Sequence, residues 1–176
     1  CGPGSNIWYC AKEGFTVYGI DGSETAINKC RDRLNREIPD WSGELHIGNI
    51  HALPLEDQQF DLVIDNECLS CNNFSNTKKS LLEIYRVLKK DGIFFSRTFS
   101  TDTWGYDTGK KIENNTYLPS EGPLADKGLI RFTDKNDIEN LYSKRFSLIK
   151  IELIQRTMMN RKKNISEWII EARKTD

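Results

Sequence analysis

Cys1-Gly-Pro-Gly4 opens the chain, and Val17-Tyr-Gly-Ile-Asp21 follows after a stretch of helical character. The glycines at positions 2 and 4 let the backbone approach a ligand closely, and a helix that starts behind them offers unpaired N–H groups. Asp21 ends a predicted buried strand, where a carboxylate accepts hydrogen bonds from both hydroxyls of a ribose. The spacing predicts a nucleoside site; a tight turn followed by a helix-capping aspartate is the alternative interpretation.

Strand and helix patterns alternate through most of the chain, which is typical of a parallel sheet covered by helices on both faces. Ser23 is a suitable N-cap for the second helix, which stops at Pro39, and Thr133 is a suitable N-cap for the last one. We expect the other helices at 5–13 and 76–88, and strands at 16–20, 45–47, 60–64 and 93–96, the last extending to 99.

The helix predicted at 76–88 has an apolar face, and the turn Lys90-Asp-Gly92 leads from it into the next strand. Helical spacing places four side chains of this helix on the face that should be buried: Leu81, Leu82, Tyr85 and Leu88.

Residues 146–154 and 166–173 are two strand patterns joined by about a dozen polar residues, and this spacing predicts an antiparallel hairpin. In the first of them Ile149, Ile151 and Leu153 alternate with charged residues, as expected of an edge strand with one wetter face.

Residues 100–131 show no period and are rich in Gly, Asn, Thr and Asp. A loop of this length inside a compact domain is usually functional, so we interpret it as a substrate loop or lid. A structural loop packed permanently against the neighbouring strands is the alternative.

Composition fits one soluble domain spanning residues 1–176, with 38% hydrophobic and 29% charged residues and a net charge of −1. This charge disfavours a nucleic-acid partner, and the basic cluster 161–163 is interpreted as a solvated hairpin loop. No apolar run approaches the length of a membrane span, so no membrane association is expected. Five scattered cysteines favour a reducing, cytoplasmic setting.

The motifs together resemble the class I S-adenosylmethionine-dependent methyltransferases, of the small-molecule type. Cys1-Gly-Pro-Gly4 is similar to the end of the family's glycine-rich motif and Val17–Asp21 to its ribose-binding strand. Gly48–Leu55 is similar to the adenine segment, Phe60–Asp65 to the fourth strand, and Leu82–Gly92 to the helix and turn before the fifth. Where many members have Asp in the adenine segment, this chain has Asn49, whose side-chain carbonyl still accepts from an amino group.

The resemblance implies a Rossmann-like, doubly wound α/β fold with a mostly parallel sheet of order 3-2-1-4-5-7-6, in which strand 7 is antiparallel. The glycine loop of this fold leaves the central first strand, which we therefore expect upstream of Cys1. The implied cofactor is S-adenosyl-L-methionine, and the implied product is S-adenosyl-L-homocysteine. The residues implied to bind the cofactor are Cys1, Gly2, Gly4, Asp21, Gly22, Asn49, Ile50, Asp65 and Asn66.

A small-molecule acceptor with an O, N or C nucleophile is the expected substrate, because the segment after the fourth strand lacks the Asn-Pro-Pro-Tyr-type motif of nucleic-acid and protein amino methyltransferases. Loop capping is the alternative role for Asp65, Asn66 and Glu67. Neither a catalytic residue nor the oligomeric state is indicated. The candidate acceptor contacts are Glu67, Arg97, Trp104 and Tyr106.

Three other interpretations compete with this one. A non-catalytic S-adenosylmethionine-binding or scaffold subunit would keep the same motifs. An NAD-binding Rossmann domain is disfavoured, because Ile7 stands where its third glycine belongs. A metal or redox site at Cys68 and Cys71 is not expected, because the chain offers only His46, His51 and three scattered cysteines as further ligands, with no second paired motif. His51 is interpreted as a loop residue beside the adenine.

Overall fold

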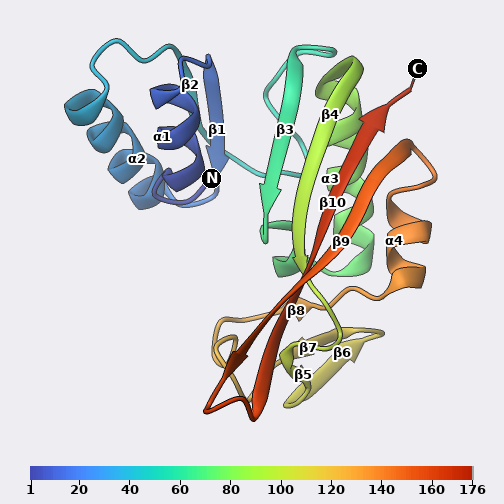
Figure 1. Cartoon of the computed structure of the whole chain (residues 1–176). Coiled ribbons are helices and arrows are strands. Elements are labelled where there is room, and N and C mark those ends of the chain that lie inside the picture. Colours follow the sequence, from blue (N-terminus) through green and yellow to red (C-terminus); the bar gives the residue numbers. More distant parts are fainter. Residues whose placement is uncertain (176) are drawn as a thin grey trace. The chain divides into compact units, whose positions relative to one another are not determined.

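The computed structural model describes residues 1–175, which divide into two compact units, one spanning Cys1–Pro54 and the other starting at Leu55 (Figure 1). The assignment of the whole chain to a single domain stays a prediction. Each unit is built from helices packed on strands, so the chain has the Rossmann-like α/β character that its sequence predicts.

The first unit is a β-α-β arrangement preceded by a helix. It contains α1 (Ser5–Lys12), β1 (Val17–Asp21), α2 (Glu24–Glu37) and β2 (Gly43–Ile47), and β1 pairs with β2 in parallel. The Ser23 side chain accepts the N–H of Ala26, as the predicted N-cap of α2 should. One buried cluster of the first unit consists of Ala11, Val17, Cys30 and Leu34.

The second unit holds a four-stranded sheet of order β3-β4-β10-β9. Its strands are β3 (Phe60–Asn66), β4 (Leu88–Phe99), β9 (Phe146–Met158) and β10 (Lys163–Lys174). β3 and β4 are parallel, whereas β10 is antiparallel to both of its neighbours. The predicted C-terminal hairpin is therefore confirmed. The helical elements are η1 (Leu69–Cys71), α3 (Phe74–Val87) and α4 (Lys135–Leu141).

Residues 100–131 are not the irregular loop that the sequence suggests. They contain β5 (Trp104–Asp107), β6 (Lys110–Glu113), β7 (Thr116–Leu118) and β8 (Ile130–Arg131). The last three form a separate antiparallel sheet, which lies beyond the carboxyl ends of β3 and β4 (Figure 1). A buried cluster of Phe99, Tyr117, Ile130 and Phe132 stabilises it. Strands of two to four residues are too short to show a period, which is why the pattern was missed.

Four further predictions about this unit are wrong in detail. Leu82 is 48% exposed, because α3 buries Leu81, Ile84 and Val87 instead. Residues 90–92 lie inside β4, where Asp91 has a φ of 61° and the β3–β4 register shifts, so they form a bulge rather than a turn before the strand. The N-cap of α4 is Asp134, which forms a capping box with Asp137, and not Thr133.

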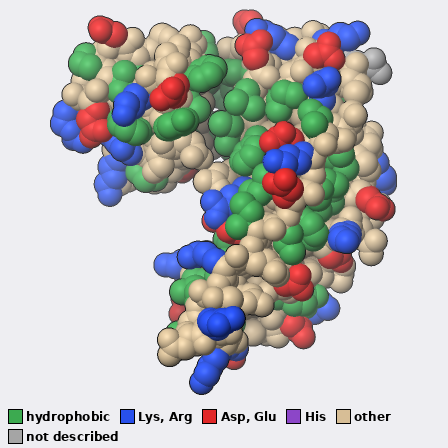
Figure 2. Space-filling model, viewed as in Figure 1, with side chains coloured by type: hydrophobic (Ala, Val, Ile, Leu, Met, Phe, Trp, Pro, Cys, Tyr) green, Lys and Arg blue, Asp and Glu red, His purple; other side chains and the backbone are tan. Residues whose placement is uncertain are grey.

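β9 is an edge strand of this sheet, as predicted, and the fourth error concerns only the burial of its apolar row. Ile149, Ile151 and Leu153 are 48%, 45% and 38% exposed, so neither face of this stretch is well buried. Figure 2 shows hydrophobic side chains at the surface over the sheet of this unit.

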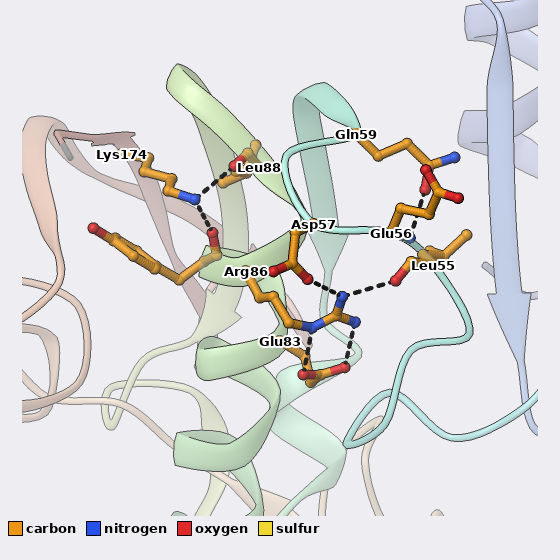
Figure 3. Close-up of polar contacts among 9 residues, drawn as sticks. Leu55, Glu56, Asp57, Gln59, Glu83, Arg86, Leu88 and Lys174 are labelled. Carbon is orange, nitrogen blue, oxygen red and sulfur yellow. Dashed lines mark hydrogen bonds and ion pairs between the residues drawn. The ribbon is translucent and has the colours of Figure 1, made fainter.

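Two basic side chains hold the ends of the second unit's elements together (Figure 3). Arg86 of α3 donates to the Leu55 carbonyl and to the Asp57 and Glu83 carboxylates, which fixes the segment before β3. Lys174 at the end of β10 donates to the Tyr85 and Leu88 carbonyls at 2.7 Å each. Among residues 1–175, no helix has the length and apolar character needed to cross a membrane.

Candidate functional site

The glycine turn at the start of the chain precedes α1, and the N–H of Gly4 donates to the Cys1 carbonyl at 3.2 Å. Gly2 and Gly4 have φ values of 57° and 87°, in the left-handed region that favours glycine. A Cβ on Gly4 would lie 2.3 Å from Cys30 Sγ, so this glycine is needed for close packing against α2. A Cβ on Gly2 would meet nothing within 4 Å, which leaves the backbone at Gly2 open to a ligand.

Asp21 joins this turn to the end of β1. Its Oδ2 accepts the N–H of Gly2 at 2.7 Å and lies 3.3 Å from the amino group of Cys1, and its Oδ1 accepts the N–H of Ser23 at 2.9 Å. Burial acts to raise the pKa of Asp21, but the hydrogen bonds from Ser23 and Gly2 outweigh it and lower the pKa. The carboxylate is therefore ionised and 25% exposed, and Oδ1 keeps a lone pair for a hydroxyl donor.

The segment after β2 lies beside Asp21, since the N–H of Gly48 donates to the Asp21 carbonyl at 3.0 Å. Asn49 is exposed, and its Oδ1 accepts the N–H of His51 at 2.9 Å. One lone pair of that oxygen remains for an amino group. Gly22 is exposed and Ile50 is half-buried. The first unit thus brings together the predicted cofactor contacts that fall within it.

Asp65 of β3 is a buried carboxylate, 5% exposed. Its Oδ2 accepts from Ser96 Oγ at 2.7 Å and its Oδ1 from the N–H of Leu69 at 3.0 Å. Burial raises the pKa of Asp65, against the opposing effect of these hydrogen bonds. The contacts to Leu69 are those of the loop-capping alternative, while Asn66 at the end of the strand is exposed. A cofactor contact from Asp65 stays a prediction.

Glu67 and Arg97, both predicted acceptor contacts, lie together at the carboxyl ends of β3 and β4. Arg97 Nε is 3.6 Å from Glu67 Oε1, and Arg97 Nη2 donates to Glu167 Oε2 at 2.5 Å. Glu167 was not among the predicted residues. In the β4–β10 register Arg97 faces Ile169, which places Glu167 two positions away on the same face of the sheet. A charged residue next to the apolar run 168–170 was the signal that could have found it.

Trp104 and Tyr106 lie in the insertion rather than in that cluster. Trp104 lines a cavity of about 280 Å³ together with residues 101–103 and 162–164, and its Nε1 donates to Glu121. Tyr106 lines the same cavity, and its ring packs edge-on against Tyr117 and Phe132. The structure therefore does not bring all four predicted acceptor contacts to one place.

Cys68 and Cys71 are exposed thiols. Among residues 1–175, no group of three or more His, Cys, Asp or Glu side chains could hold a metal ion, and the five cysteines are free thiols.

Residues 1–164 match the family described as a methyltransferase domain, and the chain belongs to that family. Its members are enzymes, and S-adenosylmethionine is the cofactor that this membership assigns. The resemblance to class I S-adenosylmethionine-dependent methyltransferases is thereby confirmed.

Individual relatives cover the chain unequally. A tRNA N(3)-methylcytidine methyltransferase of Schizosaccharomyces pombe is 21% identical over 177 residues, which are 96% of this chain and 56% of that protein. A malonyl-[acyl-carrier protein] O-methyltransferase of Nitrosospira multiformis is 32% identical over 102 residues, 50% of this chain and 32% of that protein. The chain thus spans about half of these relatives or less.

A solved structure supports the fold independently. The S-adenosylmethionine-dependent methyltransferase from Methanosarcina mazei superimposes with a TM-score of 0.83 at 19% identity, covering 99% of this chain and 89% of that one.

Proposed function

We propose that the protein containing this chain transfers the methyl group of S-adenosylmethionine to an oxygen, nitrogen or carbon nucleophile of a small-molecule acceptor. The observation that carries the cofactor part is the ionised, accessible Asp21 held against the open backbone of Gly2. A ribose needs a strand-end carboxylate with a free lone pair, and close approach of a ligand needs backbone that no side chain covers; Asp21 and Gly2 supply these in the first unit.

In this proposal Asp21 binds the ribose hydroxyls, and Asn49 and Ile50 contact the adenine. The turn Cys1-Gly-Pro-Gly4 and Gly22 lie against the backbone side of the bound cofactor. Asp65 and Asn66 are assigned to its amino-acid part. The cofactor supplies an activated methyl group, so the chain's residues have to bind and orient the acceptor and exclude water. The insertion at 100–131 is assigned to acceptor binding, as a cover over the site.

The small-molecule acceptor is supported by charge. The net charge is −1, and Asp65, Glu67 and Glu167 gather near the carboxyl ends of β3 and β4. With two glutamates beside one arginine, this end of the sheet offers no net positive charge to a phosphate backbone. We further propose a reducing, cytoplasmic location, supported by the five free thiols. The full strand order 3-2-1-4-5-7-6 belongs to the same proposal.

Thermal unfolding tests the cofactor assignment. S-adenosylhomocysteine should raise the melting temperature of the complete protein by binding its native state, and NADH should not. A shift with NADH and none with S-adenosylhomocysteine would overturn the proposal. Incubation with labelled cofactor and a metabolite extract then tests transfer: binding without label in any acceptor fraction would favour the scaffold alternative.

A tRNA acceptor is the second candidate, because the tRNA-modifying relative aligns with 96% of the chain. Arg161, Lys162 and Lys163 stand exposed at the tip of the β9–β10 hairpin and would contact phosphates. Binding to bulk tRNA at increasing salt separates the candidates. A steep loss of affinity with salt, removed by neutralising these three residues, would favour tRNA.

A further inference from the structure

Two carboxylates share one guanidinium in the second unit. Glu67 directly follows β3, Arg97 lies on β4 and Glu167 on β10, and Arg97 contacts both acids, at 3.6 Å and 2.5 Å. One positive charge cannot neutralise two negative ones, so the cluster has a tendency to hold a proton. Arg97 and Glu167 are held by the paired strands β4 and β10, and Glu67 is the first residue after β3, so the sheet fixes two members of the cluster and the end of β3 places the third.

The two acids differ in access. The Glu167 side chain is 3% exposed, whereas that of Glu67 is 35% exposed. The backbone of Glu67 is held with a φ of 66°, and its N–H donates to the Arg97 carbonyl at 2.8 Å. A ligand at the carboxyl ends of β3 and β4 would therefore meet Glu67 and not Glu167.

Several charged groups on neighbouring elements act on the pair. Asp65 lies on β3, Arg97 on β4 and Arg156 on β9. The Cys71 thiol in η1 is a further titratable neighbour, and burial raises its pKa. Burial, followed by the hydrogen bond and charge of Glu167, raises the pKa of Glu67 to about 7. Burial also acts to raise the pKa of Glu167, but its hydrogen bonds with Glu67 and Arg97 prevail and lower it. The proton of the pair therefore belongs to Glu67.

We propose that Glu67 is the catalytic proton acceptor for methyl transfer to a protic acceptor, and that Glu167 and Arg97 position it. This inference rests on the proposed function. The acceptor's nucleophilic atom forms a bond to the methyl carbon, the carbon–sulfur bond breaks and its electron pair stays on sulfur. The proton of the nucleophile moves to a carboxylate oxygen of Glu67, which becomes a carboxylic acid hydrogen-bonded to Glu167.

A direct titration tests the proton site without any acceptor. In the complete protein labelled with ¹³C at glutamate carboxyl carbons, the Glu67 resonance, assigned by its loss in Glu67→Gln, should titrate near pH 7. In Glu167→Gln the neighbouring negative charge is gone, so the midpoint should fall by about one pH unit or more. A Glu67 midpoint in the ordinary carboxylate range in the unaltered protein would overturn the inference.

A transfer assay tests the role, using the metabolite fraction that the unaltered protein labels. Glu67→Gln should lower the rate by about 10²–10⁴-fold, the usual contribution of a general base, while the affinity for S-adenosylhomocysteine stays within about twofold. In Glu167→Gln the rise of rate with pH should move to lower pH together with the NMR midpoint. Glu152→Gln, an exposed glutamate on β9, is the matched control and should change neither quantity.

The outcomes separate the two proposals. Failure of the unaltered protein to bind S-adenosylhomocysteine would overturn the proposed function itself. Normal binding with an unchanged rate in Glu67→Gln would overturn only the role of Glu67.

Discussion

Ser96 stands opposite Asp65 in the parallel β3–β4 register, and its hydroxyl donates to the buried carboxylate at 2.7 Å. Burial raises the pKa of Asp65, so this acid holds its proton more tightly in the folded chain than in the unfolded one. Its contribution to the free energy of unfolding is therefore lost as pH rises through the folded pKa. The Ser96 bond offsets part of this loss, because it favours the ionised form.

We therefore expect Ser96→Ala to lower the free energy of unfolding by ~1.5–3 kcal/mol at pH above the folded pKa of Asp65, and by less in acid. Urea unfolding on both sides of that pKa measures the difference. Tyr142→Phe is the control: its hydroxyl is 3.1 Å from Ser96 Oγ, and burial raises its own pKa to about 12, so its effect should not depend on pH over this range. Equal losses for Ser96→Ala at both pH values would contradict the expectation.

Replacing Asp21 with alanine should weaken binding of S-adenosylhomocysteine by ~1–3 kcal/mol, because ribose hydroxyls lose a charged acceptor. The variant also frees the N–H groups of Gly2 and Ser23, so the turn itself is loosened. Isothermal titration calorimetry gives the affinity. Asp32→Ala, at an exposed position of α2, is the matched control. Unchanged affinity in Asp21→Ala would mean that the acid only caps the turn.

Only part of the insertion at 100–131 should move when this segment opens and closes over the acceptor. Arg131 is 1% exposed and donates to Thr77 and Thr133, so moving β8 would expose a buried cation. Hydrogen exchange should show residues 130–131 protected in every state, and residues 107–114 and 119–128 gaining protection with S-adenosylhomocysteine and the acceptor fraction. Equal strong protection of the whole segment in both states would show that the cover does not open.

Lys174→Met should lower the free energy of unfolding by ~1.5–3 kcal/mol, since methionine keeps the apolar stem but removes the charged donor. The ammonium is buried and donates hydrogen bonds to two carbonyls of the α3–β4 connection (Figure 3). Chemical denaturation measures the loss. Lys150→Met, which breaks an exposed ion pair with Glu152, should change the free energy of unfolding much less than Lys174→Met does. Similar losses in both variants would mean that the buried contact of Lys174 adds nothing.

Local patterns were sufficient to predict the helices and most strands, because α1, α2, α3 and the strands of the main sheet are long enough to show a period. The short strands β5–β8 carry no such signal. The bulge at Asp91 was missed for a different reason: Asp-Gly is a strong turn signal, and pairing with β3 overrides it.

The site was predictable to the same degree. Asp21 and Asn49 follow predicted strands, so their position at strand ends was readable from the sequence. Glu167 was not, since its contact with Arg97 depends on the register between strands 70 positions apart. Non-local pairing of this kind leaves no mark on a single sequence beyond an isolated charge in an apolar run.

The place of β10 has a consequence for synthesis on the ribosome. β10 follows β9 in the chain yet lies between β4 and β9, and β9 pairs only with β10 among the described strands. While residues 100–162 are being made, the edge of β4 has no partner, and an unpaired edge in a nascent chain invites association with other chains. The nascent chain can therefore associate with other chains through β4 until β10 has left the exit tunnel.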